Sequence, residues 1–178
     1  MFEPTIKSMA KQNKLEYKSV QAEDMPENMR PDVFPYFYLI EDEKMLETTL
    51  FGNNISNPIG LAAGFDKSAE VYNSLFKFGF GFIEVGTVTP KQQLGNPKPR
   101  IFRLEKDLAI INRLGFNNEG MHKIKNRLAK YSRQGIVGIN IGANKNSNDQ
   151  SEDYCKVLTE IHSYVDYATI NILSLIHI

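Results

Sequence analysis

Lysine and asparagine side chains occur in this sequence where short apolar runs end. The run at residues 59–64 contains only apolar and small residues, and Asp66 and Lys67 come soon after it. Small residues leave room for a flat group against the backbone, and Lys67 would add a positive charge beside that group. This combination fits a flat, electron-rich ligand such as a flavin ring. A solvated lysine at the end of a strand is the alternative interpretation.

Polar residues also stand in or after three later apolar runs. Asn140 and Asn171 lie inside such runs, where a buried amide must be hydrogen-bonded. Thr87, Asn144 and Lys145 follow runs of the same kind. For Thr87 and Asn144, a role in satisfying loops or helix ends is as good an explanation as a role in binding.

The stretch INRLGFNN at residues 111–118 places Asn112, Asn117 and Asn118 around a Gly-Phe pair. An asparagine amide offers a donor and an acceptor side by side, which matches the imide edge of a pyrimidine. We expect Asn118 to cap the helix that follows. Asn112 has no such structural explanation and is a candidate ligand-binding residue.

The elements that must position these residues alternate along the chain. Apolar patterns predict four strands separated by three helices, with a short hairpin before them that turns at residues 52–54. Ser68 and Ser151 are the expected caps of the first and third helices, and Leu158 is expected to face inward with Val157. The segment 90–117 is predicted to be an irregular insert. The predicted strands are residues 59–64, 81–89, 136–142 and 167–172.

This strand and helix alternation predicts a parallel sheet covered by helices, with strands that are apolar on both faces. An open doubly wound sheet and a (β/α)₈ barrel both satisfy that pattern. The barrel needs roughly 250 residues, and the segment from residue 57 onward has about half of that. The chain is therefore predicted to be either an open-sheet domain or a truncated barrel. In both, the carboxyl ends of the strands would share one pocket.

The composition excludes several classes of protein. The chain has 178 residues with 21 basic and 21 acidic side chains, which argues against a general nucleic-acid binder. The one cysteine, Cys155, excludes an intramolecular disulfide and a cysteine-based zinc site. We expect no metal site, because the three histidines show no ligand spacing. No segment has the length and apolarity needed to span a bilayer.

Four blocks of sequence, in this order, resemble the dihydroorotate dehydrogenase family, in its class 2, quinone-dependent branch. The resemblance covers residues 46–172. Because several independent blocks agree, it is more specific than any one of them. The blocks are NPIGLAAGFDK, GFGFIEVGTVTPKQQLGNPKPRIFRL, INRLGFNNEG and GINIGANK.

The resemblance implies an α/β fold, a (β/α)₈ TIM barrel that is truncated here to about its first four βα units. Residues 1–45 would form an N-terminal arm, and residues 46–178 the first half of the barrel. The arm would be helical and face a membrane or quinone; a partly ordered arm with one packed aromatic segment at residues 33–40 is the alternative interpretation. The family oxidises dihydroorotate to orotate in pyrimidine synthesis, with FMN as the hydride acceptor and a quinone as the final electron acceptor. The resemblance also implies that the protein associates peripherally with the bacterial cell membrane or the mitochondrial inner membrane. Otherwise, a cytoplasmic location is expected.

The resemblance also implies a set of site residues. Ser174 stands at the position of the family's serine base, which would take a proton from the carbon next to a carbonyl. The cofactor would contact Ala63, Gly64, Phe65, Asp66, Lys67, Thr87, Asn140 and Asn171. The substrate would contact Lys67, Asn112, Arg113, Leu114, Gly115, Phe116 and Asn171.

The chain departs from the family pattern at its end. After Ile172 it reads LSLIHI, where the family has a Ser-Ser-Pro-Asn-Thr motif. We expect the chain to correspond to the N-terminal half of such an enzyme and to be unable to hold FMN tightly or to turn over alone, because a half barrel leaves open sheet edges and an exposed core. The alternatives are another FMN-dependent barrel oxidoreductase acting on pyrimidines and a non-catalytic fragment.

Overall fold

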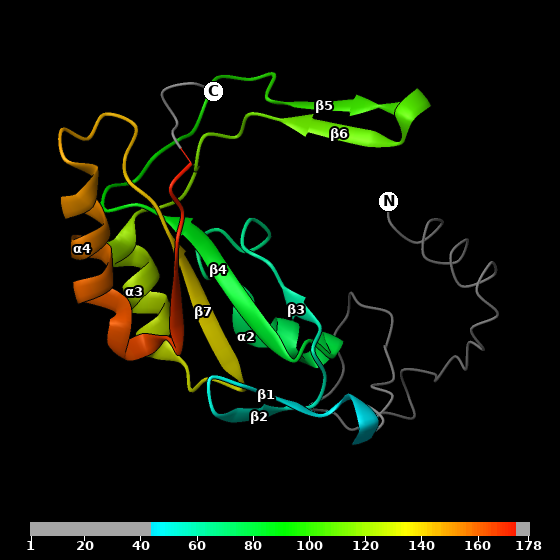
Figure 1. Cartoon of the computed structure of the whole chain (residues 1–178). Helices are drawn as coiled ribbons and strands as arrows, with labels where there is room; N and C mark the ends of the chain where they lie inside the picture. The colour runs from blue at the N-terminus through cyan, green and yellow to red at the C-terminus, as the bar shows by residue number, and fades with distance from the viewer. Residues whose placement is uncertain (1–43, 174–178) are drawn as a thin grey trace, which may run out of the picture. The chain divides into compact units, whose positions relative to one another are not determined.

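A parallel sheet of four strands organises the part of the chain that the computed structural model describes, residues 44–173 (Figure 1). The strands lie in the order β3-β4-β7-β8, so strands that follow one another in this sheet are also neighbours. Parallel neighbours joined by helices confirm the predicted α/β class. The four strands are β3 Gly60–Leu61, β4 Phe82–Val88, β7 Ile136–Ile141 and β8 Tyr167–Ile170.

Three α-helices connect these strands, and α3 and α4 lie side by side along the sheet (Figure 1). The first predicted helix is shorter than expected, with one α-helical turn followed by a 3₁₀ turn that ends at Gly79 in the left-handed conformation. The α-helices are α2 Tyr72–Leu75, α3 Met121–Lys130 and α4 Gln150–Ile161. The 3₁₀ turns are η3 Lys44–Leu46, η4 Phe76–Phe78, η5 Glu105–Asp107 and η6 His162–Tyr164.

The two faces of the sheet differ in polarity. Ile83 and Val85 of β4 and Ile139 of β7 belong to one buried core with α2, α3 and α4. Because side chains alternate along a strand, Glu84 and Asn140 lie on the opposite face. The prediction that the strands are apolar on both faces is therefore wrong. The polar face carries the groups from which the candidate site is built.

Strand β4 contains an irregularity near its carboxyl end. Gly86 is paired with Asn140 and Val88 with Ile141, so two steps along β4 match one step along β7. Thr87 is the extra residue of this bulge. Bulges re-aim side chains and are frequent beside functional sites.

Two antiparallel hairpins flank the sheet. The first pairs β1 Thr48–Leu50 with β2 Asn53–Ile55, and its turn is Phe51-Gly52 rather than the predicted residues 52–54. Both turn residues have positive φ values, 50° and 77°, as a two-residue hairpin turn requires.

The second hairpin corrects the prediction of an irregular insert. It pairs β5 Ile101–Leu104 with β6 Ala109–Asn112, and the chain reverses through η5. Cross-strand pairs such as Phe102 with Ile111 favour strands here. All eight strand residues are exposed, so burial does not mark these strands in the sequence as it marks those of the main sheet.

Both predicted serine caps and one predicted core residue are wrong. The Asp149 carboxylate, not Ser151, caps α4 by accepting a hydrogen bond from the Glu152 N–H at 3.1 Å. Ser68 Oγ instead accepts from the backbone N–H of Glu119 at 3.2 Å. Leu158 is 41% exposed, whereas Val157 is fully buried, because the buried stripe of α4 follows Val157 and Ile161 one helical turn apart.

Within residues 44–173, the structure contains no helix with the length and apolarity to span a membrane. The predicted arm lies outside this range except for its last two residues. Ser174 also lies outside the described residues.

Candidate functional site

Three polar residues meet at the carboxyl end of the sheet: Thr87 on β4, Asn140 on β7, and Asn171 directly after β8. Thr87 Oγ1 donates to Oδ1 of Asn140 at 2.6 Å. Nδ2 of Asn171 donates to the same Oδ1 at 3.3 Å and contacts Thr87 Oγ1 at 3.4 Å. Thr87 and Asn140 are buried, so these bonds satisfy groups that would otherwise be costly to bury. The structure thus brings together three residues that sequence reasoning proposed separately.

A carboxylate lies beneath these three residues on the same face. Glu84 Oε1 accepts from Nδ2 of Asn140 at 3.0 Å, and Glu84 Oε2 accepts from Oγ1 of Thr169 at 2.8 Å. The ring of Tyr167 crosses Gly138, where an added Cβ would lie 2.0 Å from the ring. Burial first, and then the nearby Glu84 carboxylate, raise the pKa of Tyr167.

The segment from Ala63 to Lys67 lies beside the bulge of β4. The Gly64 N–H donates to the Gly86 carbonyl at 2.9 Å, and the Gly86 N–H donates to the Asp66 carbonyl at 3.1 Å. Ala63 is half-buried, and Phe65 is 68% exposed. These predicted cofactor residues are therefore at the same end of the sheet as Thr87.

The Asp66 side chain is committed to the backbone that follows it. Its Oδ1 accepts from the Glu70 N–H and its Oδ2 from the Val71 N–H, both at 2.8 Å. Asp66 is buried and holds the turn before α2, whose N-cap residue, Val71, has no side-chain cap. It fixes the turn that carries Lys67.

Lys67 is half-buried, and its pKa is lowered, first by burial and second by the positive charge of Arg100. Among the residues that the structure describes, its ammonium group has no hydrogen-bond or ion-pair partner. A half-buried cation without a partner favours binding an anion, because an anion would compensate the cost of burial.

The predicted substrate segment, residues 112–116, is held by side chains from the start of the insert. Gln93 Nε2 donates to the Gly115 carbonyl at 3.0 Å, and Asn96 Nδ2 donates to the Arg113 carbonyl at 2.9 Å. The other end of the Gln93 amide accepts from the Lys145 N–H at 2.9 Å, just after β7. The segment is thereby tied to the carboxyl end of the sheet.

Phe116 is the member of this segment that reaches the polar network. An added Cβ at Gly142 would lie 2.7 Å from Cγ2 of Thr87 and 3.2 Å from the Phe116 ring. Because Gly142 has no side chain, the Phe116 ring and the Thr87 methyl group can occupy the space beside its backbone. Asn118 fixes the backbone here, since its Nδ2 donates to the Phe116 carbonyl at 2.8 Å.

Two predicted substrate residues point elsewhere. Asn112 is exposed, and its Oδ1 accepts from the Leu114 N–H at 3.4 Å. The Arg113 guanidinium donates to the Pro99 carbonyl at 3.1 Å and lies 5.9 Å from the centre of the Phe102 ring. Neither side chain contacts Asn140 or the other network residues in the described structure.

Asn118 organises the start of α3 differently from the prediction. The N-cap residue is Gly120, and the Asn118 Oδ1 accepts from its N–H at 2.9 Å. The same side chain donates to Thr89 Oγ1 at 2.9 Å, so it joins the end of β4 to the helix.

Sequence reasoning missed Glu84, Gln93 and Asn96. Glu84 carried a usable signal, because it is a charged residue inside an apolar strand of the sequence. Gln93 and Asn96 carried none, because their partners belong to segments that the fold alone brings near.

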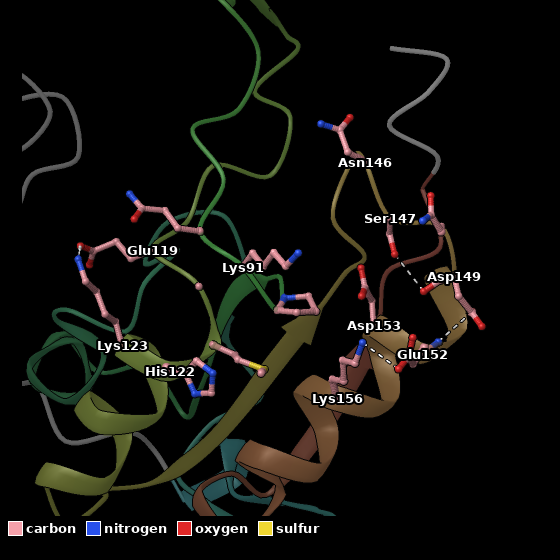
Figure 2. Close-up of a pocket in the computed structure, with 15 residues that line it drawn as sticks. Lys91, Glu119, His122, Lys123, Asn146, Ser147, Asp149, Glu152, Asp153 and Lys156 are labelled. Carbon is pink, nitrogen blue, oxygen red and sulfur yellow. Dashed lines mark hydrogen bonds and ion pairs between the residues drawn. The ribbon is translucent and has the colours of Figure 1, made fainter.

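A cavity of about 700 Å³ lies elsewhere, between the beginnings of α3 and α4. Figure 2 shows Lys91, His122 and Lys156 around it together with acidic residues of α4. Lys156 pairs with Glu152 at 2.9 Å, so the charges of both signs partly compensate one another. None of the predicted site residues lines this cavity, and the polar network on the sheet remains the candidate site.

Comparisons with known proteins identify the family. Residues 45–174 match the family model described as dihydroorotate dehydrogenase. A protein named dihydroorotate dehydrogenase (quinone) from Rhodopseudomonas palustris strain TIE-1 is 54% identical over 134 residues, which are 75% of this chain and 37% of that protein. A protein of the same name from Bartonella henselae is 56% identical over 132 residues, 74% of this chain and 36% of that protein.

A solved structure agrees with this result. The crystal structure of the enzyme DHODH from Eimeria tenella, in complex with ferulenol, superposes with a TM-score of 0.70 at 44% identity. The match covers 78% of this chain and 39% of that one. The chain thus spans well under half the length of the relatives that it matches. With the family model covering most of its residues, this chain belongs to the dihydroorotate dehydrogenase family.

Proposed function

We propose that this chain supplies the first part of the active site of a quinone-dependent dihydroorotate dehydrogenase, which oxidises dihydroorotate to orotate in pyrimidine synthesis. The observation that carries the proposal is the meeting of Thr87, Asn140 and Asn171 beside the turn that bears Lys67. Sequence similarity to enzymes of that name supports the substrate and the quinone.

The residues at this end of the sheet fit an FMN ring. Gly64 has a φ of 108° and open space where a side chain would stand, so a flat group can approach the backbone. The amides of Asn140 and Asn171 offer donors and acceptors of the kind that a flavin's imide edge pairs with. FMN would accept a hydride from the substrate. Ala63–Lys67, Thr87, Asn140 and Asn171 would hold it.

The chain's residues would also orient the substrate. Lys67 would bind the orotate carboxylate, and its lack of a partner within the described residues leaves it free to do so. The backbone of residues 112–116, held by Gln93 and Asn96, would form one wall. The Phe116 ring packed near Thr87 would help to exclude water from that wall.

The proton acceptor remains a prediction. Ser174 is the proposed base, and a serine needs a dry and prearranged setting to act as one. The Oδ1 of Asn171 accepts from the Leu173 N–H at 3.1 Å, which orders the backbone leading toward Ser174.

The wider architecture is proposed as the first four βα units of a (β/α)₈ barrel. In the described structure, β3 and β8 are the outer strands of the sheet, and Ile170 of β8 is 57% exposed. In a closed barrel, further strands would pair with both edges and a further helix would cover Ile170. Peripheral membrane association at the inner membrane is proposed on the resemblance to quinone-dependent enzymes alone.

The test joins residues 1–172 of this chain to the remaining barrel segment of the Bartonella henselae relative. We expect this extended chimera to bind FMN and to reduce a quinone analogue with dihydroorotate. Lys67→Ala in the chimera should abolish turnover. A folded chimera that binds FMN but ignores dihydroorotate would refute the proposed substrate.

A further inference from the structure

Glu84 is surrounded by hydrogen-bond donors. It receives one bond from Asn140 Nδ2 at 3.0 Å and one from Thr169 Oγ1 at 2.8 Å, and Tyr167 lies beside it. An ionised carboxylate is the only side chain that accepts from several donors without offering one. The polar face of the sheet therefore has a fixed acceptor beneath the candidate site.

This acceptor determines how the Asn140 amide is turned. With Nδ2 directed at Glu84, the Oδ1 must face Thr87 and Asn171, where it accepts at 2.6 and 3.3 Å. The opposite orientation would set Oδ1 against the carboxylate and Nδ2 against the Asn171 amide donors. Both contacts would then be repulsive.

The direction of bonding continues through the network. Because Asn140 presents its Oδ1 as an acceptor, the Thr87 hydroxyl donates its proton to that oxygen. The lone pairs of the Thr87 hydroxyl are then left to accept from the Asn171 amide. Donation thus runs from Asn171 and Thr87 to Asn140, and from Asn140 to Glu84. Glu84 lies opposite Gly138, and the lack of a side chain there admits the Tyr167 ring that shields the carboxylate.

We propose that Glu84 is a positioning residue that fixes the orientation of the Asn140 amide, and with it the acceptors and donors offered to the ligand. The part of this inference that concerns the ligand rests on the proposed flavin site. The orientation itself does not, and it can be measured without any ligand.

The experiment uses nuclear Overhauser effects of the full chain. In the unaltered chain, the Nδ2 protons of Asn140 should be close to the Glu84 and Thr169 side-chain protons and not to Hβ of Thr87. In Glu84→Gln, the new side chain can turn its NH₂ group toward Asn140, so the acceptor there is no longer fixed. We expect the Asn140 amide to populate the reversed orientation, with contacts to Thr87 appearing.

Thr169→Val is the matched control, because it removes the other donor to Glu84 and leaves the Asn140 bond intact. Its Asn140 contacts should stay as in the unaltered chain. Retention of the same contacts in Glu84→Gln would overturn the inference. Contacts of the Nδ2 protons with Thr87 in the unaltered chain would also overturn it, even if the variant does not fold.

FMN binding by the extended chimera separates this inference from the proposed function. In the chimera, Glu84→Gln should need about tenfold more FMN than Thr169→Val. Equal FMN requirements would contradict a positioning role toward the ligand. If the chimera binds no FMN, the proposed flavin site fails, while the orientation measured without ligand still decides the role of Glu84.

Discussion

Thr87 and Asn140 are 53 residues apart in the sequence, and their side chains form a 2.6 Å hydrogen bond. The bulge at Gly86 and Val88 inserts Thr87 as an extra residue opposite β7, and this insertion directs its hydroxyl toward Asn140. The bond ties the second strand of the sheet to the third at the point where the proposed ligand would lie.

Thr87→Val should weaken FMN binding by the extended chimera about fivefold to tenfold, because Asn140 loses its shortest hydrogen bond at the site. Flavin fluorescence titration measures the change. Thr159→Val, on the exposed side of α4, is the control and should bind like the parent. Equal affinity of the Thr87 variant would show that the hydroxyl has no role in presenting Asn140.

Lys67 should make the chain less stable at neutral pH than it would be with an apolar residue there. Burial and then Arg100 lower its pKa below the unfolded value of 10.5, so the unfolded state binds the proton more strongly. The destabilisation caused by charged Lys67 is fully present below its folded-state pKa. It disappears as the pH rises to the unfolded-state pKa of 10.5. Since Lys67 is only half-buried, we expect Lys67→Met to add less than about 1 kcal/mol at pH 7.

Urea unfolding across pH 7 to 10.5 tests this sign. The gain from Lys67→Met should shrink as the pH rises, whereas Lys77→Met at an exposed position should give no such trend. A gain that grows with pH would be the reverse of the expected linkage.

Asp66→Ala should lower the free energy of unfolding by about 2 kcal/mol, because two backbone N–H groups lose a buried, charged acceptor. Asp107→Ala, in the exposed turn η5, should cost nothing measurable. Urea denaturation of the two variants gives the comparison. Equal stability of both would mean that water replaces the Asp66 carboxylate at no cost.

Gln93→Ala should release the loop after β7 from the insert. The Lys145 N–H donates to the Gln93 amide, so its hydrogen exchange should accelerate about tenfold in the variant. Gln92→Ala alters the adjacent exposed side chain and should leave this exchange unchanged. Unchanged exchange in Gln93→Ala would show that the side chain does not hold the loop.

The sequence indicated the order of strands and helices well, because the apolar spacing reflects burial directly. The core positions Ile83, Val137 and Ile124 follow from that spacing. The sequence failed at the insert, where exposed strands have no burial pattern, and at the helix starts, where Asp149 caps α4 in place of Ser151 and no side chain caps α2. Asp, Asn, Ser and Thr all suit a cap, so the sequence alone did not distinguish the residue that the turn brings close.

The sequence by itself determined the family and the polar residues at the strand ends, since both depend on residue types in a fixed order. Only the tertiary structure decided which of these residues meet. Glu84 contacts Asn140 at a separation of 56 residues and Thr169 at a separation of 85, through the register of three parallel strands. Register is a property of the assembled sheet, so no local pattern encodes these contacts. The sequence could therefore mark Glu84 only as a charged residue in an apolar strand, whereas its contacts with Asn140 and Thr169 needed the assembled sheet.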